Sequence, residues 1–371
     1  MLSDKCKHAR TFESVGAAAA WQVCGEARCG APAPSSEGRN RPAMGAGPVT
    51  STEADRTAHD VITMGRVGVD LYPLRTGCSL AEVDRFGRYL GGSATNVAVA
   101  AARHERRAAV ITRTGDDPFG VFIHSALRGY GVDDRYVSAV PKLPTPITFC
   151  EMFPPDDFPL YFYRYPKAPD LEIAAAELDL AAIIRAGVFW ATVTGLCDEP
   201  SRTATLTALR CRERRHPTIL DLDYRPMFWQ SREAAGRWAR EALPAATVAV
   251  GNLDECEMAV GTRDPDRAAD ALLELGLSLA VIKQGPAGVL VRDQHCEVRV
   301  PPILVQVVNG LGAGDAFGGA LCHGLLTSWD LATVARFANA AGAIVASQIP
   351  CSDAMPTTAQ VLALLEETPG A

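Results

Sequence analysis

Short apolar segments typical of strands alternate with amphipathic segments typical of helices along most of this chain, from Asp60 onward. The expected strands cover residues 61–69, 108–112, 188–193, 218–222, 247–250 and 279–282, and the expected helices cover 93–103, 119–130, 202–214 and 266–275. Because the crossover between parallel strands is usually a helix, this alternation favours a mainly parallel sheet covered on both faces. We therefore predict a doubly wound α/β fold.

Two segments interrupt the alternation. Residues 71–90 carry turn residues without a helical pattern, and residues 146–165 hold two short strands on either side of Pro154–Asp157. A flap of this kind beside an α/β sheet commonly closes over substrate. We predict a small antiparallel lid formed from both segments, with a purely structural excursion as the alternative.

The N-terminal part of the chain has a different character. Residues 1–58 show no sustained periodicity and are rich in Gly, Ala, Pro, Ser and Arg. A segment of this composition cannot bury enough apolar surface to offset its ordering entropy. We expect a disordered extension, with Met44 as an alternative start, followed by one folded domain over residues 59–371.

Charge and cysteine usage narrow the classes of partner. A formal net charge of -7 disfavours binding to nucleic acid or to an anionic membrane surface. No uninterrupted apolar stretch approaches the ~18 residues that a spanning helix needs. The eleven cysteines include no Cys-x-x-Cys pair, which argues against zinc and against a disulfide framework. The chain is therefore expected in the cytoplasm, without a nucleic-acid or membrane partner.

The segment before Asp315 carries the strongest chemical signal. Gly310, Gly312 and Gly314 lie between a strand expected to end near Val308 and a helix expected to start around Asp315. Glycines let backbone N–H groups approach a ligand, and a helix N-terminus attracts anions, so this loop suits a transferring phosphoryl group. Asp315 could serve only as a helix cap, but the three glycines favour a general base that deprotonates an attacking hydroxyl.

A second glycine pair, Gly91–Gly92, opens the helix expected at 93–103 and sets Asn96 in its first turns. A simple turn from loop to helix is the alternative. Two common nucleotide motifs do not fit the chain. The P-loop pattern is absent, and the loop before Asp315 lacks the third glycine of the dinucleotide fingerprint, which argues against an NAD-dependent dehydrogenase.

Taken together, the two glycine sites resemble the ribokinase-like (phosphofructokinase-B type) carbohydrate kinase family. Gly91–Asn96 matches the first family motif and Gly312–Asp315 the second, and the resemblance covers residues 60–367. It implies a ribokinase-like fold and an ATP-dependent kinase that uses Mg²⁺. In that family Asp315 would be the general base, and the anion hole would comprise Gly312, Ala313 and Gly314.

The resemblance also implies roles for residues outside these loops. Asp70, Gly92 and Asn96 match positions that hold sugar hydroxyls. Asn252 and Glu255 match an Asn-x-x-Glu motif that organises Mg²⁺ and phosphate. Their contact with the Mg²⁺ ion is expected to be indirect. The residues expected to line the nucleotide pocket are Asn252, Lys283, Gly285, Gly288, Gly312, Gly314 and Asn339.

The motifs leave cation binding and oligomeric state undecided. Asn309–Gly310 stand where the family commonly has Asp-Thr, so binding of an activating monovalent cation is an open question. A homodimer formed through the lid is another. A sugar-sensing relative without catalysis is disfavoured, because Asp315 and the glycines before it are present.

Two arginines indicate which class of acceptor the kinase would bind. Arg164 follows the second lid strand, and Arg225 follows the strand at 218–222, where ligands of open α/β sheets bind. A guanidinium binds a carboxylate bidentately, which suits a sugar acid, although a surface ion pair is the alternative for each arginine.

Short segments resemble the sugar-acid kinases of the family: Gly65–Arg66 with Asp70–Leu71, Leu222–Pro226 and Ser352–Pro356. The resemblance implies phosphorylation of the primary C6 hydroxyl of 5-dehydro-2-deoxygluconate, a keto acid of myo-inositol breakdown. The deoxy keto acid 2-keto-3-deoxygluconate is the alternative acceptor.

Overall fold

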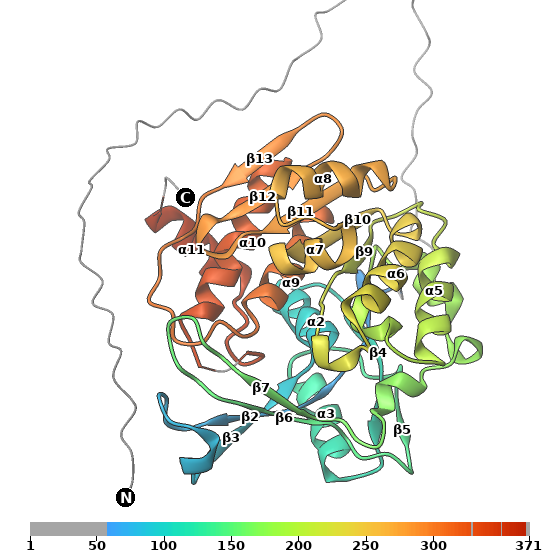
Figure 1. The fold of residues 1–371 in the computed structure, drawn as a ribbon, viewed down its shortest axis with the longest axis vertical. Coiled ribbons are helices and arrows are strands. Elements are labelled where there is room, and N and C mark those ends of the chain that lie inside the picture. The colour runs from blue at the N-terminus through green and yellow to red at the C-terminus, as the bar shows by residue number, and fades with distance from the viewer. Residues whose placement is uncertain (1–57, 328, 350, 369–371) are drawn as a thin grey trace, which may run out of the picture.

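A computed structural model describes residues 58–327, 329–349 and 351–368 of the chain (Figure 1). The extension expected over residues 1–58 lies outside these residues except for its last position, as does the alternative start at Met44.

The main element is a nine-stranded sheet with the order β13-β12-β11-β10-β9-β8-β1-β4-β5. Its strands are β1 Val61–Met64, β4 Ala108–Gly115, β5 Val137–Val140, β8 Val188–Thr192, β9 Thr218–Asp221, β10 Val248–Asn252, β11 Leu279–Lys283, β12 Val289–Arg292 and β13 Glu297–Val300. Neighbours from β11 to β5 pair in parallel, and only the pairs β11–β12 and β12–β13 are antiparallel. The predicted mainly parallel sheet is confirmed.

Helices cover both faces of this sheet. One face packs against α2 Ser93–Arg103, α3 Pro118–Gly129, α9 Ala313–Leu325, α10 Leu331–Ala346 and α11 Thr358–Glu367. The other packs against α4 Leu180–Arg185, α5 Ser201–Cys211, α6 Arg232–Ala242, α7 Leu253–Val260 and α8 Pro265–Glu274. In β1, Val61 belongs to the first core and Ile62 and Met64 to the second, as the two-residue period of a strand requires.

Four strands form a separate small sheet, which we call the lid: β2 Gly68–Pro73, β3 Phe86–Gly91, β6 Ile147–Cys150 and β7 Leu160–Tyr163. Their order is β3-β2-β6-β7, with β2 and β6 parallel and the outer pairs antiparallel. In Figure 1 the lid lies at the lower left, beyond the N-terminal end of α2. The predicted small sheet beside the α/β sheet is confirmed, and its closing over substrate stays a prediction.

The single strand expected at residues 61–69 is wrong. β1 ends at Met64, and the chain crosses through Gly65–Val67 into lid strand β2. The valines on both sides of Gly65–Arg66 continue the apolar pattern, so periodicity alone gives no signal for such a change of sheet. As a result Asp70 lies within the lid, not at the end of the first strand of the main sheet.

The strand expected to end near Val308 is also absent, because residues 301–308 adopt no regular structure. The amide N–H groups of Val308 and Asn309 donate to the carbonyl of Ala346, at 2.8 and 3.2 Å. The end of helix α10 therefore satisfies a backbone that a neighbouring strand would otherwise pair.

Short 3-10 helices join several of these elements: η1 Leu80–Glu82, η2 Pro169–Glu172, η3 Ala175–Glu177, η4 Val193–Leu196, η5 Pro226–Phe228, η6 Leu243–Ala245 and η7 Gly285–Ala287. Among the helices of the described residues, none has both the length and the apolar character to cross a membrane.

Candidate active site

The candidate site lies where helices α2 and α9 begin. These two helices pack against each other, which brings the start of α2 next to Asp315 in the first turn of α9. Ser93 Oγ donates to Asp315 Oδ1 at 2.9 Å, and Asn96 Nδ2 donates to Asp315 Oδ2 at 2.8 Å. Each oxygen of the carboxylate therefore has one oriented donor.

The protonation of Asp315 is set by competing effects. Removal from water raises the pKa of this carboxyl above its ordinary value, and the hydrogen bonds from Asn96 and Ser93 act to lower it. A carboxylate that is held by two donors, with a raised pKa, can accept a proton from a hydroxyl placed next to it.

The start of α9 depends on Gly312. Its backbone is left-handed, with φ of 80°, and a Cβ at this position would lie 2.8 Å from Cβ and Sγ of Cys351. Only glycine fits this turn without strain. The turn leaves the first N–H groups of the helix without intrahelical acceptors, which is the arrangement that binds anions.

Gly92 plays the matching part at the start of α2, with φ of 104°. A Cβ on Gly92 would come within 2.4 Å of the carbonyl oxygen of Arg66. The turn from β3 into α2 thus packs closely against the connection from β1 to the lid. This contact keeps Ser93 near Arg66.

Asp70 belongs to the same region. Tyr72 OH donates to Asp70 Oδ2 at 3.1 Å and also lies 2.7 Å from Cys351 Sγ. Removal from water raises the pKa of Asp70 to about 6, although Arg66 and the Tyr72 hydrogen bond act to lower it, and the charge of Asp315 adds to the rise. The structure therefore brings Asp70, Asn96 and Asp315 together, as the sequence predicts.

Two arginines share one buried carboxylate near these acids. Arg225 Nη2 lies 3.0 Å from Asp223 Oδ1, and Arg66 Nε lies 3.4 Å from Asp223 Oδ2, which also accepts a hydrogen bond from Thr194. Burial acts to raise the pKa of Asp223, but Arg225 and Arg66 outweigh it and hold the pKa below its ordinary value. We call Arg66, Asp223 and Arg225 the arginine cluster.

Arg66 was not predicted as a site residue. The segment Gly65–Arg66 was noted only because it resembles the sugar-acid kinases. Sequence reasoning also paired Arg225 with Arg164, whereas the structure gives Arg164 a different partner. Arg164 Nη2 contacts both oxygens of Asp170, at 2.8 and 3.1 Å, and its guanidinium lies 4.8 Å from the centre of the Phe228 ring. Arg164 and Arg225 therefore belong to separate ion pairs.

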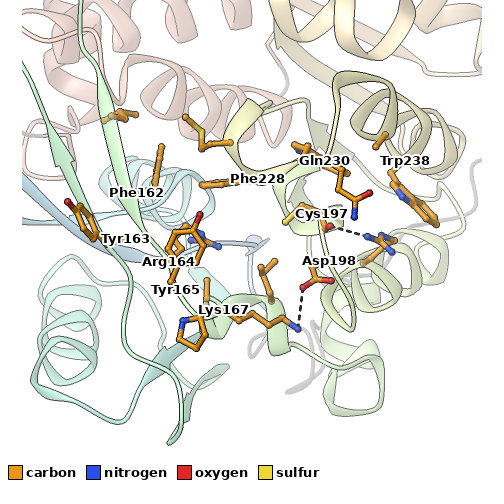
Figure 2. Close-up of a pocket in the computed structure, with 18 of the residues that line it drawn as sticks. Phe162, Tyr163, Arg164, Tyr165, Lys167, Cys197, Asp198, Phe228, Gln230 and Trp238 are labelled. Atoms are coloured by element: carbon orange, nitrogen blue, oxygen red, sulfur yellow. Dashed lines mark hydrogen bonds and ion pairs between the residues drawn. The ribbon is translucent and has the colours of Figure 1, made fainter.

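Arg164 lines a cavity of about 810 Å3 between lid strand β7 and helix α6 (Figure 2). Phe162 and Phe228 also line it, with ring centres 4.9 Å apart, and Phe162 contacts Arg66 on the side of the arginine cluster. Asp315 is not part of this lining. The cavity thus adjoins the candidate site at the lid without containing the general-base candidate.

A lysine lies beside the loop before Asp315. Lys283 ends β11, and a Cβ added to Gly314 would lie 3.2 Å from its Nζ. Burial acts to lower the pKa of Lys283, but Asp221, Glu255 and Asp315 outweigh it and hold the pKa above its ordinary value. The ammonium group is therefore available next to the anion-binding turn.

Asp221, which ends β9, was not predicted. Burial raises its pKa to about 8, although the charge of Lys283 acts to lower it. Its Oδ2 lies 3.4 Å from Ser93 Oγ. A buried acid that experiences the charge of a lysine from another strand of the sheet gives no periodic signal in the sequence.

Asn252 and Glu255, the predicted magnesium residues, form a capping box at the start of α7. Asn252 Oδ1 accepts from the Glu255 N–H at 2.9 Å, and Glu255 Oε2 accepts from the Asn252 N–H at 2.7 Å. Among the described residues, no group of three or more His, Cys, Asp or Glu side chains could hold a metal ion.

The other predicted nucleotide residues lie near the antiparallel edge of the sheet. Gly285 and Gly288 form the turn between β11 and β12, closed by a 3.0 Å bond from Gly288 N–H to the Gly285 carbonyl. Asn339 on α10 donates to the carbonyl of Pro301 at 2.9 Å. Both sites meet the end of β13, because a Cβ on Gly288 would contact Val300 and Pro301.

Asn309 is fully buried, at the position where cation binding was left open. Its Nδ2 donates to the Ile349 carbonyl at 2.6 Å, and its Oδ1 accepts from the Leu311 N–H at 3.0 Å. The amide thus ties the loop before α9 to the segment after α10.

A doubly wound sheet with a lid, and an anion-binding helix start that carries a carboxylate beside a lysine, together define a sugar kinase of ribokinase-like fold. Residues 58–358 match the pfkB family carbohydrate kinases, and the chain belongs to this family. It is 32% identical over 307 residues to 5-dehydro-2-deoxygluconokinase of Photobacterium profundum, covering 80% of this chain and 92% of the relative.

Two further comparisons agree. The 5-dehydro-2-deoxygluconokinase of Geobacillus kaustophilus is 32% identical over 316 residues, which cover 83% of this chain and 94% of the relative. The crystal structure of fructokinase with bound ATP from Xylella fastidiosa has a TM-score of 0.74 at 23% identity and covers 84% of this chain and 99% of that chain. The structural comparison shows that the fold is shared.

Proposed function

We propose that this kinase transfers the γ-phosphoryl group of ATP to a primary hydroxyl of a sugar acid, with 5-dehydro-2-deoxygluconate as the leading acceptor. The observation that carries the proposal is the carboxylate of Asp315, held by Ser93 and Asn96 at an anion-binding helix start. The names of the bacterial relatives support the acceptor. The alternative acceptor is 2-keto-3-deoxygluconate.

In the proposed reaction, Asp315 accepts the proton of the acceptor hydroxyl while the hydroxyl oxygen attacks the γ-phosphorus. The bond between the γ-phosphorus and the oxygen that bridges it to the β-phosphorus breaks, and ADP leaves with that oxygen. Gly312, Ala313 and Gly314 direct backbone N–H groups at the transferring group, which stabilises charge in the transition state. Asp70, Gly92 and Asn96 are the proposed contacts of the sugar hydroxyls.

For the nucleotide, we propose Asn252, Lys283, Gly285, Gly288 and Asn339, with Lys283 beside Gly314 as the cation that faces the phosphates. Mg²⁺ would neutralise phosphate charge when bound. Glu255 already gives one carboxylate oxygen to the Asn252 N–H. This supports an ion held largely by phosphate oxygens and water, as Mg²⁺ commonly is.

For the acceptor carboxylate, Arg225 and Arg164 are proposed contacts, and the arginine cluster adds Arg66. The electrostatic influence of Arg66 reaches both Asp70 and Asp315, so an acceptor whose carboxylate is bound by Arg66 and Arg225 can extend its C6 hydroxyl toward Asp315. Arg164 is the weaker of these contacts, because Asp170 neutralises it one to one, whereas Arg66 and Arg225 share the single carboxylate of Asp223.

The acceptor is tested by measuring ADP release with a panel of acids and neutral sugars. We expect a kcat/KM for 5-dehydro-2-deoxygluconate well above that for 2-keto-3-deoxygluconate, fructose and ribose. If fructose or ribose were phosphorylated as efficiently as either acid, the acceptor assignment would be wrong, while the kinase assignment would stand. Running the assay in KCl and in NaCl also decides the open question of a monovalent cation.

We further propose a homodimer formed through the lid. Phe86, Phe149 and Tyr163 form a row of rings across three lid strands, with successive ring centres 5.4 Å apart. Tyr163 is 62% exposed, and β7 is an edge strand of the lid. Phe86 and Phe149 are partly buried, so the row reaches the surface at Tyr163, and an exposed aromatic side chain at a sheet edge is typical of a surface that a partner covers.

A further inference from the structure

The segment that follows helix α10 reaches the general-base candidate from the far end of the chain. Ser352 is fully buried, and its Oγ lies 2.7 Å from Asn96 Oδ1 and 2.7 Å from the carbonyl oxygen of Leu90. The same Asn96 donates from Nδ2 to Asp315 Oδ2. Ser352, Asn96 and Asp315 thus form a continuous chain of hydrogen bonds.

The chain of bonds decides which way the amide of Asn96 points. An amide group has a donor on one side and an acceptor on the other. An ionised Asp315 accepts only from the NH₂ side, so the oxygen of Asn96 must face Ser352. The Ser352 hydroxyl has one hydrogen, which the Asn96 oxygen shares with the carbonyl oxygen of Leu90, and its donation to Asn96 holds the NH₂ group on the carboxylate.

Without the Ser352 hydroxyl, the amide oxygen of Asn96 would be buried without its donor. Rotation of the amide would then place that oxygen against the Asp315 carboxylate, where it repels the ionised form. After that rotation Asp315 lacks the hydrogen bond from Asn96, and the loss of a donor raises the pKa of a carboxylate.

The residue next to Ser352 contacts the other side of the site. Cys351 Sγ lies 2.7 Å from Tyr72 OH, which donates to Asp70, and Cys351 also packs on the Gly312 turn. Two successive residues therefore support both carboxylates of the site.

We propose that Ser352 is a positioning residue for the general base and acts through the amide of Asn96. The inference rests on the proposed function, in that it takes Asp315 as the base. Ser352 touches neither the acceptor nor the nucleotide in this proposal; it fixes the orientation of a group that does.

The pH dependence identifies this role. Asp315 also experiences the charges of Arg66, Asp70, Asp221, Asp223, Arg225 and Lys283. These groups all remain in a Ser352→Ala variant, so a change in the titration of the base reports the lost hydrogen bond. The acid limb of kcat/KM should move to higher pH.

The experiment compares Ser352→Ala with Ser347→Ala, a matched control whose hydroxyl donates to the Ile344 carbonyl at the end of α10. We expect Ser352→Ala to lower kcat ~10-fold with the KM for ATP unchanged, as for a buried group left without its donor. Ser347→Ala should leave both unchanged. Ser352→Cys, which preserves volume but donates weakly, replaces Ser352→Ala if that variant does not fold.

A double-mutant cycle with Asn96→Leu gives the decisive outcome. Because Ser352 acts through Asn96, adding Ser352→Ala to Asn96→Leu should cause no further loss in kcat. A full second loss, or a lower Tm with kcat and the acid limb unchanged, would overturn the proposal. Asp315→Asn is measured in parallel: if Asp315→Asn stayed active, the base assignment itself would fail, and with it the proposed function.

Discussion

At the scale of single residues, Asp315 lies in the first turn of a helix that follows a glycine turn. Each of these two features could serve the fold alone, without a role in catalysis. Exchange for asparagine keeps the shape and removes the basicity. We expect Asp315→Asn to retain its Tm and to lower kcat by ~10²–10⁴, the usual contribution of a positioned general base. A coupled assay of ADP release measures this change.

The matched control is Asp330→Asn at the start of α10, where Asp330 caps the helix by accepting from the Thr333 N–H. This variant should lose some stability and keep its activity. If Asp315→Asn retained more than about half of the wild-type kcat, Asp315 would be a cap of the same kind.

Arg225 gives a second test at this scale. Arg225→Ala removes one arm of the arginine cluster and leaves Asp223 with Arg66 alone. We expect kcat/KM for the acid acceptor to fall by an amount that corresponds to ~2–5 kcal/mol of lost transition-state stabilisation, as for truncating one partner of a desolvated charge pair. The KM for ATP should be nearly unchanged. Arg263→Ala, at an exposed ion pair with Asp254, is the control. An equal loss with a neutral sugar would contradict a carboxylate contact.

Asp70 couples the site to stability. Its pKa rises from 3.8 to about 6 in the folded protein, chiefly by desolvation, so the native state binds more protons than the unfolded chain between these values. Its contribution to stability is therefore complete below pH 3.8 and is lost as the pH rises through about 6. Asp70→Asn should gain Tm relative to wild type as pH is raised from 4 to 7, measured by thermal melts. A difference in Tm that does not depend on pH would contradict this linkage.

Residues with local signals could be predicted from the sequence, and residues with long-range roles could not. Asp315, Asn96 and Gly92 stand in glycine motifs whose backbone demands are visible in the sequence. Ser352 bonds to a residue 256 positions earlier, and Arg66 bonds to Asp223 across 157 positions. Nothing near either residue indicates its partner.

At the scale of elements, the helix at Ser93–Arg103 has the predicted bounds, because a glycine turn starts it and its small, buried residues give way to the charged segment 103–107. The single strand predicted at 61–69 is divided between two sheets, since both halves are apolar and buried. The strands β12 and β13 went unpredicted, as they pair antiparallel after a short turn and interrupt the alternation. Periodicity thus identifies elements but not the sheet to which each belongs.

The lid gives the prediction at this scale. Phe162 on β7 packs on Phe228 and on Arg66, and so joins the lid to the main domain. We expect Phe162→Ala to raise the KM for the acceptor and to increase ATP hydrolysis without acceptor, because a looser lid admits water. Tyr165→Ala, at an 82% exposed position after the lid, should change neither. Unchanged hydrolysis in Phe162→Ala would indicate that this contact does not control closure.

At the scale of the whole molecule, the proposed dimer predicts a change of mass. Wild-type protein should sediment as a dimer, and Tyr163→Glu should dissociate it by placing a charge in the aromatic row of the lid. Tyr161→Phe, which loses a hydroxyl bonded to Glu151 but keeps the ring, is the control and should remain dimeric. A wild-type monomer at micromolar concentration would rule out this assembly.

The bond between Ser352 and Asn96 also has a consequence for biosynthesis. The first glycine motif is translated more than two hundred residues before Ser352, so the amide oxygen of Asn96 can gain its donor only when residues 351–352 have left the ribosome. A nascent chain can thus build most of the sheet while its base remains poorly oriented. Competence for phosphoryl transfer would come once residues 351–352 have emerged, after the fold that supports it.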